Sequence, residues 1–348
     1  MNPLILALML FTLGLGSTIT FASSNWLLAW MGLEINTLAI LPIIAQHHHP
    51  RAVEATAKYF VAQATAAAML MFAGMTSAWS SGEWQISQMT DPLPITLITL
   101  ALALKIGLAP THSWLPEVIQ GIDFVSGLIL STWQKLAPFA LLLQLPSTDP
   151  TLLLMLGITS VMVGGWGGLN QTQLRKILAY SSIAHLGWTV LVMQFSPNLA
   201  LLTLFIYFIS TFSAFLAFKF NNSTSINSLA TSWVKSPMVS VIVPLVLLSL
   251  GGLPPLTGFL PKWLIIQELT KHDLVPLAML AAFSALLSLY FYVRLAYALS
   301  LTASPNTLVN TAPWRYSTSR LTLTMSSTTI GAIFLLPLAP VIITLLSQ

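Results

Sequence analysis

The sequence predicts an all-α polytopic membrane protein with eleven transmembrane helices, arranged as two inverted five-helix repeats with broken fourth and ninth helices plus a C-terminal helix. Three observations predict this fold class. Hydrophobic residues make up 56% of the 348 positions and charged residues only 6%, whereas a soluble domain carries about a quarter charged residues. Apolar runs of about twenty residues, long enough to cross a bilayer, recur along the chain. A motif that contains glycine and proline also recurs at a fixed offset of 145 residues.

The apolar runs define the expected spans. The first run has no basic segment before it and no clear cleavage site, so we expect a permanent span and not a signal peptide. The fourth and ninth runs continue past a break into second halves at 112–121 and 256–269. The eleven runs lie near residues 3–22, 26–45, 53–76, 93–110, 125–145, 152–169, 173–194, 198–218, 237–254, 275–299 and 322–346.

The positive charges predict an orientation. When the runs alternate across the membrane, nine basic residues fall on the N-terminal side and Lys271 alone falls on the opposite side. Lys and Arg collect on the cytoplasmic or matrix side of a membrane protein. The N-terminus is therefore expected on that side and the C-terminus on the other. The nine residues are Arg51, Lys58, Arg175, Lys176, Lys219, Lys235, Arg294, Arg315 and Arg320.

The internal repeat is carried by GLAPTHSWLPE at residues 107–117 and GLPPLTGFLPK at residues 252–262. The matching positions are Gly107, Leu108, Pro110, Leu115 and Pro116 in the first motif and Gly252, Leu253, Pro255, Leu260 and Pro261 in the second. The same shift moves the first three spans onto the sixth, seventh and eighth. Five is an odd number, so the two repeats are expected to face opposite ways across the membrane, as in many transporters.

We therefore expect one membrane domain with three parts. Residues 1–147 form the first repeat, residues 148–300 the second, and residues 301–348 a loop with the final helix.

The two motifs predict helix breaks at membrane depth. The residues that interrupt the helices are Gly107, Pro110, Gly252, Pro254 and Pro255. Non-helical backbone at this depth is tolerated only where protein buries it or water reaches it. Broken helices near the midplane commonly form ion sites in transporters.

Four ionisable residues lie near the middle of an apolar run or just after a break within one: Glu34, Lys105, Lys135 and Lys262. Each costs about 2.5–3.5 kcal/mol on insertion scales. Buried salt bridges that fix helix packing are one interpretation, but one glutamate cannot neutralise three lysines. Proton-translocating groups along a hydrated path fit the pattern better.

The two lysines at the breaks differ in position along the motif. Lys105 precedes its break, so it should lie at the negative end of a helix segment, with Glu34 as its expected partner. Lys262 follows its break, so it should lie near the positive end of the restarted helix.

Other polar groups carry weaker signals. His112 and His185 are candidates for proton relay, because histidine titrates nearest to physiological pH; a hydrogen-bonded packing role is the alternative for each. The tract His47 to Pro50 is expected to be a solvated loop and not a metal site. The chain has no cysteine, which excludes disulfides and thiolate metal sites. The net charge of +4 is too scattered to indicate nucleic-acid binding.

Several stretches resemble a known family. These are SSNWLLAWMGLEINTLAI, PRAVEATAKYFVAQATAAAM, KIGLAPTHSWLPEV, LSTWQKLAP and GGLPPLTGFLPKW. Across essentially the whole chain, the sequence is similar to the antiporter-like subunits of animal mitochondrial NADH:ubiquinone oxidoreductase, respiratory complex I. Family members usually have fourteen spans, and the animal form lacks the first three.

The resemblance implies a proton-translocating subunit in the membrane arm of this enzyme, in the mitochondrial inner membrane, with the N-terminus in the matrix and the C-terminus in the intermembrane space. It implies a Glu34–Lys105 pair, a connecting Lys135 and a second broken-helix lysine at Lys262. Expected partners are other membrane-arm subunits, including neighbouring antiporter-like ones, and phospholipids. FMN, iron–sulfur clusters and ubiquinone are expected in other subunits, with no cofactor, metal or redox chemistry in this chain.

Three other functions remain open from the residues alone. A cation/proton antiporter outside complex I would share the repeats and lysines. A structural spacer in the membrane arm would use the lysines only in salt bridges. An enzyme with a quinone site is the weakest, because no pocket motif supports it.

Overall fold

The computed structural model describes residues 3–46, 49–89, 91–145, 150–234, 236–302, 322–338, 340–341 and 344. Within these residues the regular structure is helical, and the only strand-like pairs are two isolated bridges. Five helices are long and apolar enough to cross a membrane, and four shorter apolar helices accompany them. The all-helical, membrane-type fold expected from composition is confirmed.

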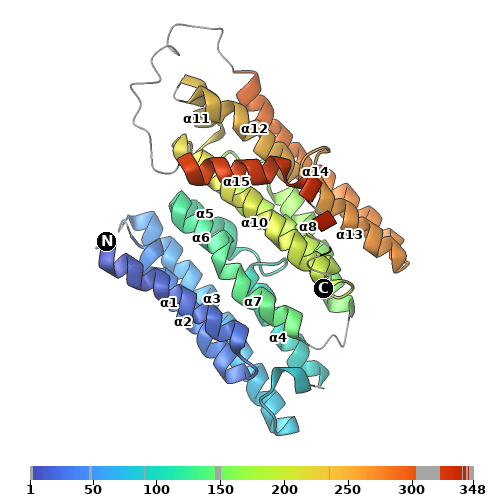
Figure 1. Cartoon of the computed structure of the whole chain (residues 1–348). Helices are drawn as coiled ribbons and strands as arrows, with labels where there is room; N and C mark the ends of the chain where they lie inside the picture. Colours follow the sequence, from blue (N-terminus) through green and yellow to red (C-terminus); the bar gives the residue numbers. More distant parts are fainter. Residues whose placement is uncertain are drawn as a thin grey trace. The chain divides into compact units, whose positions relative to one another are not determined.

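The chain divides into two compact units, Met1–Leu156 and Gly157–Gln348. The helices of the first unit are α1 (Pro3–Ala22), α2 (Trp26–Ile44), α3 (Pro50–Ser81), α4 (Pro92–Ile106), α5 (Trp114–Gly121), α6 (Phe124–Ser131) and α7 (Trp133–Gln144). In Figure 1, α1, α2 and α3 run side by side, and α2 contacts both α1 and α3. Helix α7 contacts α1, α2 and α4, so it lies at the centre of this unit.

The second unit is built around α10. Its helices are α9 (Leu174–Val192), α10 (Pro197–Phe220), α11 (Ile226–Ala230), α12 (Pro237–Gly251), α13 (Phe259–Lys271), α14 (Val275–Ser300) and α15 (Thr322–Phe334), and α8 (Pro150–Gly167) contains the boundary between the units. Helix α10 contacts α9, α12, α13 and α15, and α15 lies next to it in Figure 1.

The two predicted breaks have the same local structure. Helix α4 is followed by Gly107 with φ 85° and ψ 42°, and α12 by Gly252 with φ 79° and ψ 38°. This left-handed conformation favours glycine, because it has no Cβ to clash. In both breaks the glycine and the leucine after it donate backbone hydrogen bonds into the last turn, as in a Schellman motif. A cis peptide bond precedes Pro110 in one break and Pro255 in the other.

A second pair of matching features lies in the connecting loops. Asn25, just before α2, bridges Gln85, and Gln173, just before α9, bridges Ser225. In each unit the first residue of the helix donates to the opposite loop: Trp26 N to Trp84 O, and Leu174 N to Thr224 O, each at 3.1 Å. These loops hold corresponding helix ends in the same way.

The fifth expected span is not continuous. Residues 125–145 were expected to form one run, but the structure divides them into α6 and α7 at Thr132. Thr132 has φ −114° and ψ −72°, and its hydroxyl donates to Leu128 O at 2.7 Å. The hydroxyl therefore competes with the backbone for this carbonyl at the interruption.

The final expected span is not one continuous helix in the described residues. Helix α15 ends at Phe334, and a short 3-10 turn, η5 (Leu336–Leu338), follows. Pro337 has no N–H with which to continue the helical hydrogen bonds. The remainder of the expected 322–346 span lies largely outside the described residues, as do His47, His48, Lys235, Arg315 and Arg320.

Candidate functional site

All three lysines predicted from the sequence are buried in the helical core. The exposed fraction is 6% for Lys105, 2% for Lys135 and 9% for Lys262. They lie on α4, α7 and α13 respectively. Lys105 and Lys135 line a cavity in the first unit, and Lys262 lines a cavity in the second.

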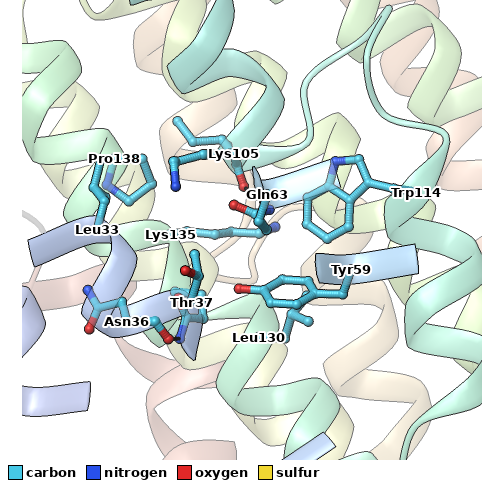
Figure 2. Close-up of a pocket in the computed structure, with 12 residues that line it drawn as sticks. Leu33, Asn36, Thr37, Tyr59, Gln63, Lys105, Trp114, Leu130, Lys135 and Pro138 are labelled. Atoms are coloured by element: carbon cyan, nitrogen blue, oxygen red, sulfur yellow. Dashed lines mark hydrogen bonds between the residues drawn. The ribbon is translucent and has the colours of Figure 1, made fainter. Parts of the chain in front are cut away.

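The first cavity brings Lys105 and Lys135 together. The cavity volume is about 10 Å³. This is roughly the room that one buried water needs. Figure 2 shows both lysine side chains extending into this space, with Tyr59, Gln63 and Trp114 around it. The cavity is lined by Leu33, Asn36, Thr37, Tyr59, Gln63, Lys105, Ile106, Trp114, Leu130, Gln134, Lys135 and Pro138.

The break beside Lys105 leaves carbonyl groups that a continuous helix would use. Two side chains compensate for this. The indole Nε1 of Trp114 donates to Leu104 O at 3.1 Å, and Gln63 Nε2 donates to Lys105 O at 3.4 Å. The helix can therefore end at this point while these buried carbonyl oxygens keep hydrogen-bond partners. Buried acceptors without partners would be costly.

Lys105 lies in the last turn of α4, where the partial negative charge of the helix end favours a cation. In the described part of the chain its Nζ has no hydrogen-bond partner. A buried ammonium that lacks protein partners beside a water-sized space is suited to exchanging a proton with water.

Glu34 is partly buried on α2 and does not line the cavity. Thr37, which does line it, donates to Glu34 Oε2 at 2.9 Å. An electrostatic attraction links Glu34 to Lys105, but among the described residues the two form no ion pair within 4.0 Å. The two expected partners are therefore not in direct contact, and Thr37 both bonds the Glu34 carboxylate and lines the cavity.

Lys135 enters the cavity from the first turn of α7, directly after the interruption at Thr132. Because α7 is the central helix of its unit, this lysine is more deeply buried than the other two.

The second cavity contains Lys262 and His185. The cavity volume is about 20 Å³, which gives room for one or two waters. Lys262 Nζ donates to Gly251 O at 2.8 Å. The side chain thus reaches back across the break to the last residue of α12. The backbone of Lys262 is in the first turn of α13, as expected, but its ammonium bonds to the carbonyl end of α12, where the partial charge is negative.

The two predicted histidines are placed differently. His185 lines the second cavity, and its ring centroid is 5.6 Å from that of Tyr207, another lining residue. His112 is partly exposed, with Nδ1 3.2 Å from Pro110 O, and it lines neither cavity. The structure therefore brings His185, but not His112, to a buried lysine.

Sequence reasoning missed several lining residues, above all Tyr59, Gln63 and Trp114. Tyr59 and Gln63 are four residues apart on α3 and therefore share a helix face. Gln63 is a polar residue in an otherwise apolar stretch, and this signal could have identified it.

A helical membrane domain with two broken helices, each beside a buried lysine and a small cavity, defines an antiporter-like membrane protein. The family model described as NADH:quinone oxidoreductase/Mrp antiporter, TM, matches residues 23–288, and NADH dehydrogenase subunit 2 C-terminus matches residues 289–343. The chain belongs to the NADH-ubiquinone oxidoreductase chain 2 family.

Its relatives agree over the full length. The chain is 68% identical over 345 residues to NADH-ubiquinone oxidoreductase chain 2 of Tetraodon nigroviridis, covering 99% of each chain. It is 64% identical to that of Salmo salar, covering 100% of each.

Among solved structures, a chain of respiratory complex I from Thermus thermophilus with bound Aureothin matches with a TM-score of 0.87 and 26% identity, over 99% of this chain and 80% of that one. A chain of the Mrp complex from Dietzia sp. DQ12-45-1b matches with a TM-score of 0.81 and 15% identity, over 97% of this chain and 76% of that one. The second likeness concerns the fold alone.

Proposed function

We propose that this chain is a proton-translocating membrane-arm subunit of respiratory complex I, in which NADH-to-ubiquinone electron transfer in other subunits is coupled to proton movement through Glu34, Lys105, Lys135 and Lys262. FMN, the iron–sulfur clusters and ubiquinone are assigned to other subunits. The full-length similarity to NADH-ubiquinone oxidoreductase chain 2 supports the assignment to this enzyme.

The observation that carries the proposal is the placement of each break lysine. Lys105 and Lys262 both lie beside a water-sized space and at the carbonyl end of a half-helix. The helix end stabilises the charged amine, and the apolar surroundings make that charge costly. A cation balanced in this way can lose and regain its proton when a nearby charge changes.

Glu34 is the nearby charge at the first site. While Glu34 is ionised, it attracts the Lys105 ammonium. When that negative charge is lost, the attraction that holds the proton on Lys105 disappears. Lys135 shares the cavity with Lys105 and is the next acceptor for the proton, directly or through one water.

His185 has a corresponding place at the second site. Its ring lines the cavity that contains Lys262, so it can pass protons to or from that lysine. His112 has no such contact and is assigned no relay role.

The proposed membrane arrangement is eleven spans in two inverted five-helix repeats, residues 1–147 and 148–300, followed by a loop and final helix in residues 301–348. The matched helix ends at Gly107 and Gly252 support this division. The nine-to-one distribution of basic residues supports an N-terminus in the mitochondrial matrix and a C-terminus in the intermembrane space.

Partners of two kinds are proposed for the outer surface. Large apolar side chains are exposed on several helices, for example Phe11, Phe72 and Phe283. Phospholipid chains and neighbouring membrane-arm subunits, including other antiporter-like ones, are suited to cover them.

The test uses complex I that carries Lys105→Met, compared with wild type and with Lys271→Met. Lys271 is exposed and pairs with Glu268 at the end of α13, so its loss controls for removing a positive charge. Protons translocated per NADH oxidised are measured in sealed membranes. A reduced ratio in Lys105→Met alone supports the proposal, and an intact complex with a normal ratio contradicts it.

A further inference from the structure

The break between α12 and α13 is hydrogen-bonded to the final helix, α15, through one carbonyl group. Ala332 O, in the last turn of α15, accepts hydrogen bonds from Ser249 Oγ at 2.6 Å and from Thr257 Oγ1. The two hydroxyls are also 3.2 Å from each other. All three residues are buried, with 0–2% of their surface exposed.

The acceptor is available because of where α15 ends. The last four carbonyls of a helix have no partner within the helix, and Ala332 is two residues before the end of α15 at Phe334. Two hydroxyls from another part of the chain use this acceptor. Leaving such a buried group without partners would be costly.

The donors lie on opposite sides of the break. Ser249 is in the last turn of α12, and Thr257 comes just before Gly258, the N-terminal cap of α13. A Cβ placed on Gly258 would lie 1.8 Å from Ser249 O, so the start of α13 is in close contact with the end of α12. Hydrogen bonds from both sides to one atom therefore fix the geometry across the break.

This geometry bears directly on Lys262. Ser249, Gly258 and Lys262 line the same cavity. Lys262 Nζ reaches Gly251 O only while the first turn of α13 stays close to the end of α12. A wider break would lengthen this hydrogen bond and enlarge the cavity.

Among the described residues, the first break is held by different bonds. At the offset of 145 residues, Ser249 corresponds to Leu104 and Thr257 to His112. Leu104 has no side-chain donor, and its own carbonyl accepts from Trp114 instead. Gln63 of α3 donates to Lys105 O at the first break. Two hydroxyls, one from each side of the break, bound to one carbonyl of another helix are thus a feature of the second lysine site.

We infer that α15 is a positioning helix for the second lysine site: Ser249 and Thr257, bound to Ala332 O, hold the second broken helix at the spacing that keeps Lys262 on Gly251 O in a closed cavity. The inference rests on the proposed function for its effect on proton transfer. Its structural part, the closure of the cavity, does not depend on that function.

Two readouts separate these parts. The chain has no native cysteine, so Thr203→Cys, at a buried position that lines the cavity from α10, places a single reporter thiol in this chain. The rate at which a small water-soluble thiol reagent labels it in assembled complex I reports opening of the cavity. Protons translocated per NADH oxidised report function.

The variants are Thr257→Val and Ser249→Ala, each in the Thr203→Cys background. Loss of one net hydrogen bond is expected to raise labelling about five-fold, and the proton ratio should fall with it. Thr257→Ser keeps the hydroxyl and should return both readouts towards the Thr203→Cys values. Ser327→Ala is the matched control, because Ser327 is exposed on α15 and bonds only within its own helix.

Unchanged labelling in an assembled complex that carries both Thr257→Val and Ser249→Ala would overturn the inference. A normal proton ratio in Lys262→Met would instead contradict the proposed function, while the labelling result would still decide whether α15 closes the cavity.

Discussion

Lys262 Nζ donates to the backbone oxygen of Gly251 at 2.8 Å, although the two residues lie on opposite sides of a helix break. Lys105 belongs to the corresponding half-helix at the first break and lies in its last turn. Both lysines therefore place positive charge at the carbonyl end of a half-helix, one from the helix before the break and one from the helix after it. The two breaks reach a similar electrostatic arrangement from different sequence positions.

Replacement of the break glycines should disturb the adjacent lysine. Gly252 has φ 79°, and a Cβ there would lie 2.9 Å from Lys262 Cδ. Gly252→Ala should destabilise the complex by about 1–2 kcal/mol from backbone strain alone. It should also weaken the hydrogen bond from Lys262 Nζ to Gly251 O. Thermal unfolding and assembly yield measure the effect.

Gly14→Ala is the matched control, because nothing lies within 4 Å of a Cβ at that helical position. It should be neutral or slightly stabilising. Equal stability of the Gly252→Ala and Gly14→Ala complexes would show that the left-handed turn is not required.

Removal of the charge at Glu34 should lower coupled turnover. Glu34→Gln keeps an oxygen that can accept from Thr37, but it loses the attraction to Lys105. NADH oxidation coupled to proton translocation is measured in sealed membranes. Glu83→Gln, at an exposed loop position, controls for the loss of one carboxylate. Near-normal pumping in Glu34→Gln would exclude the assigned role.

The indole of Trp114 should stabilise the first break through its N–H group. Trp114→Phe keeps an aromatic ring next to Tyr59 but removes the donor to Leu104 O. The expected loss is about 1 kcal/mol for one net hydrogen bond, because Leu104 O keeps its bond from Gly107 N at 3.2 Å. The thermal midpoint of the assembled complex should fall. Trp79→Phe, at a side chain that is 93% exposed, should leave it unchanged.

Opposite faces of the membrane should be reached at Lys176 and Lys271. Lys271→Cys should react with a membrane-impermeant thiol reagent added from the intermembrane space, and Lys176→Cys should react only from the matrix side. The distribution of basic residues along the sequence motivates this expectation. The reverse labelling pattern would invert the proposed orientation.

The breaks were predictable because each depends on local chemistry. Gly107 and Gly252 adopt a conformation that favours glycine, and prolines follow them within three residues. The three lysines could be singled out for a similar reason, since charge stands out in an apolar run whatever its tertiary contacts.

Contacts between distant residues could not be predicted in this way. Nothing in the local sequence indicates that Lys105 and Lys135 share one cavity, or that Lys262 reaches back to Gly251. The bonds from Ser249 and Thr257 to Ala332 join residues 75 or more positions apart. Serine and threonine are common in apolar helices, so their partners become apparent only when the helices are packed together.

The central claim is that the buried lysines release and accept protons and do not only supply fixed charge. Lys105→Arg tests it most directly, because arginine keeps the positive charge but is not deprotonated in proteins. The measurement is the number of protons translocated per NADH oxidised by assembled complex I, with Lys105→Met alongside. The account predicts that both variants lower the ratio. A normal ratio in Lys105→Arg together with a reduced ratio in Lys105→Met would show that only the charge of Lys105 is needed, and would contradict it.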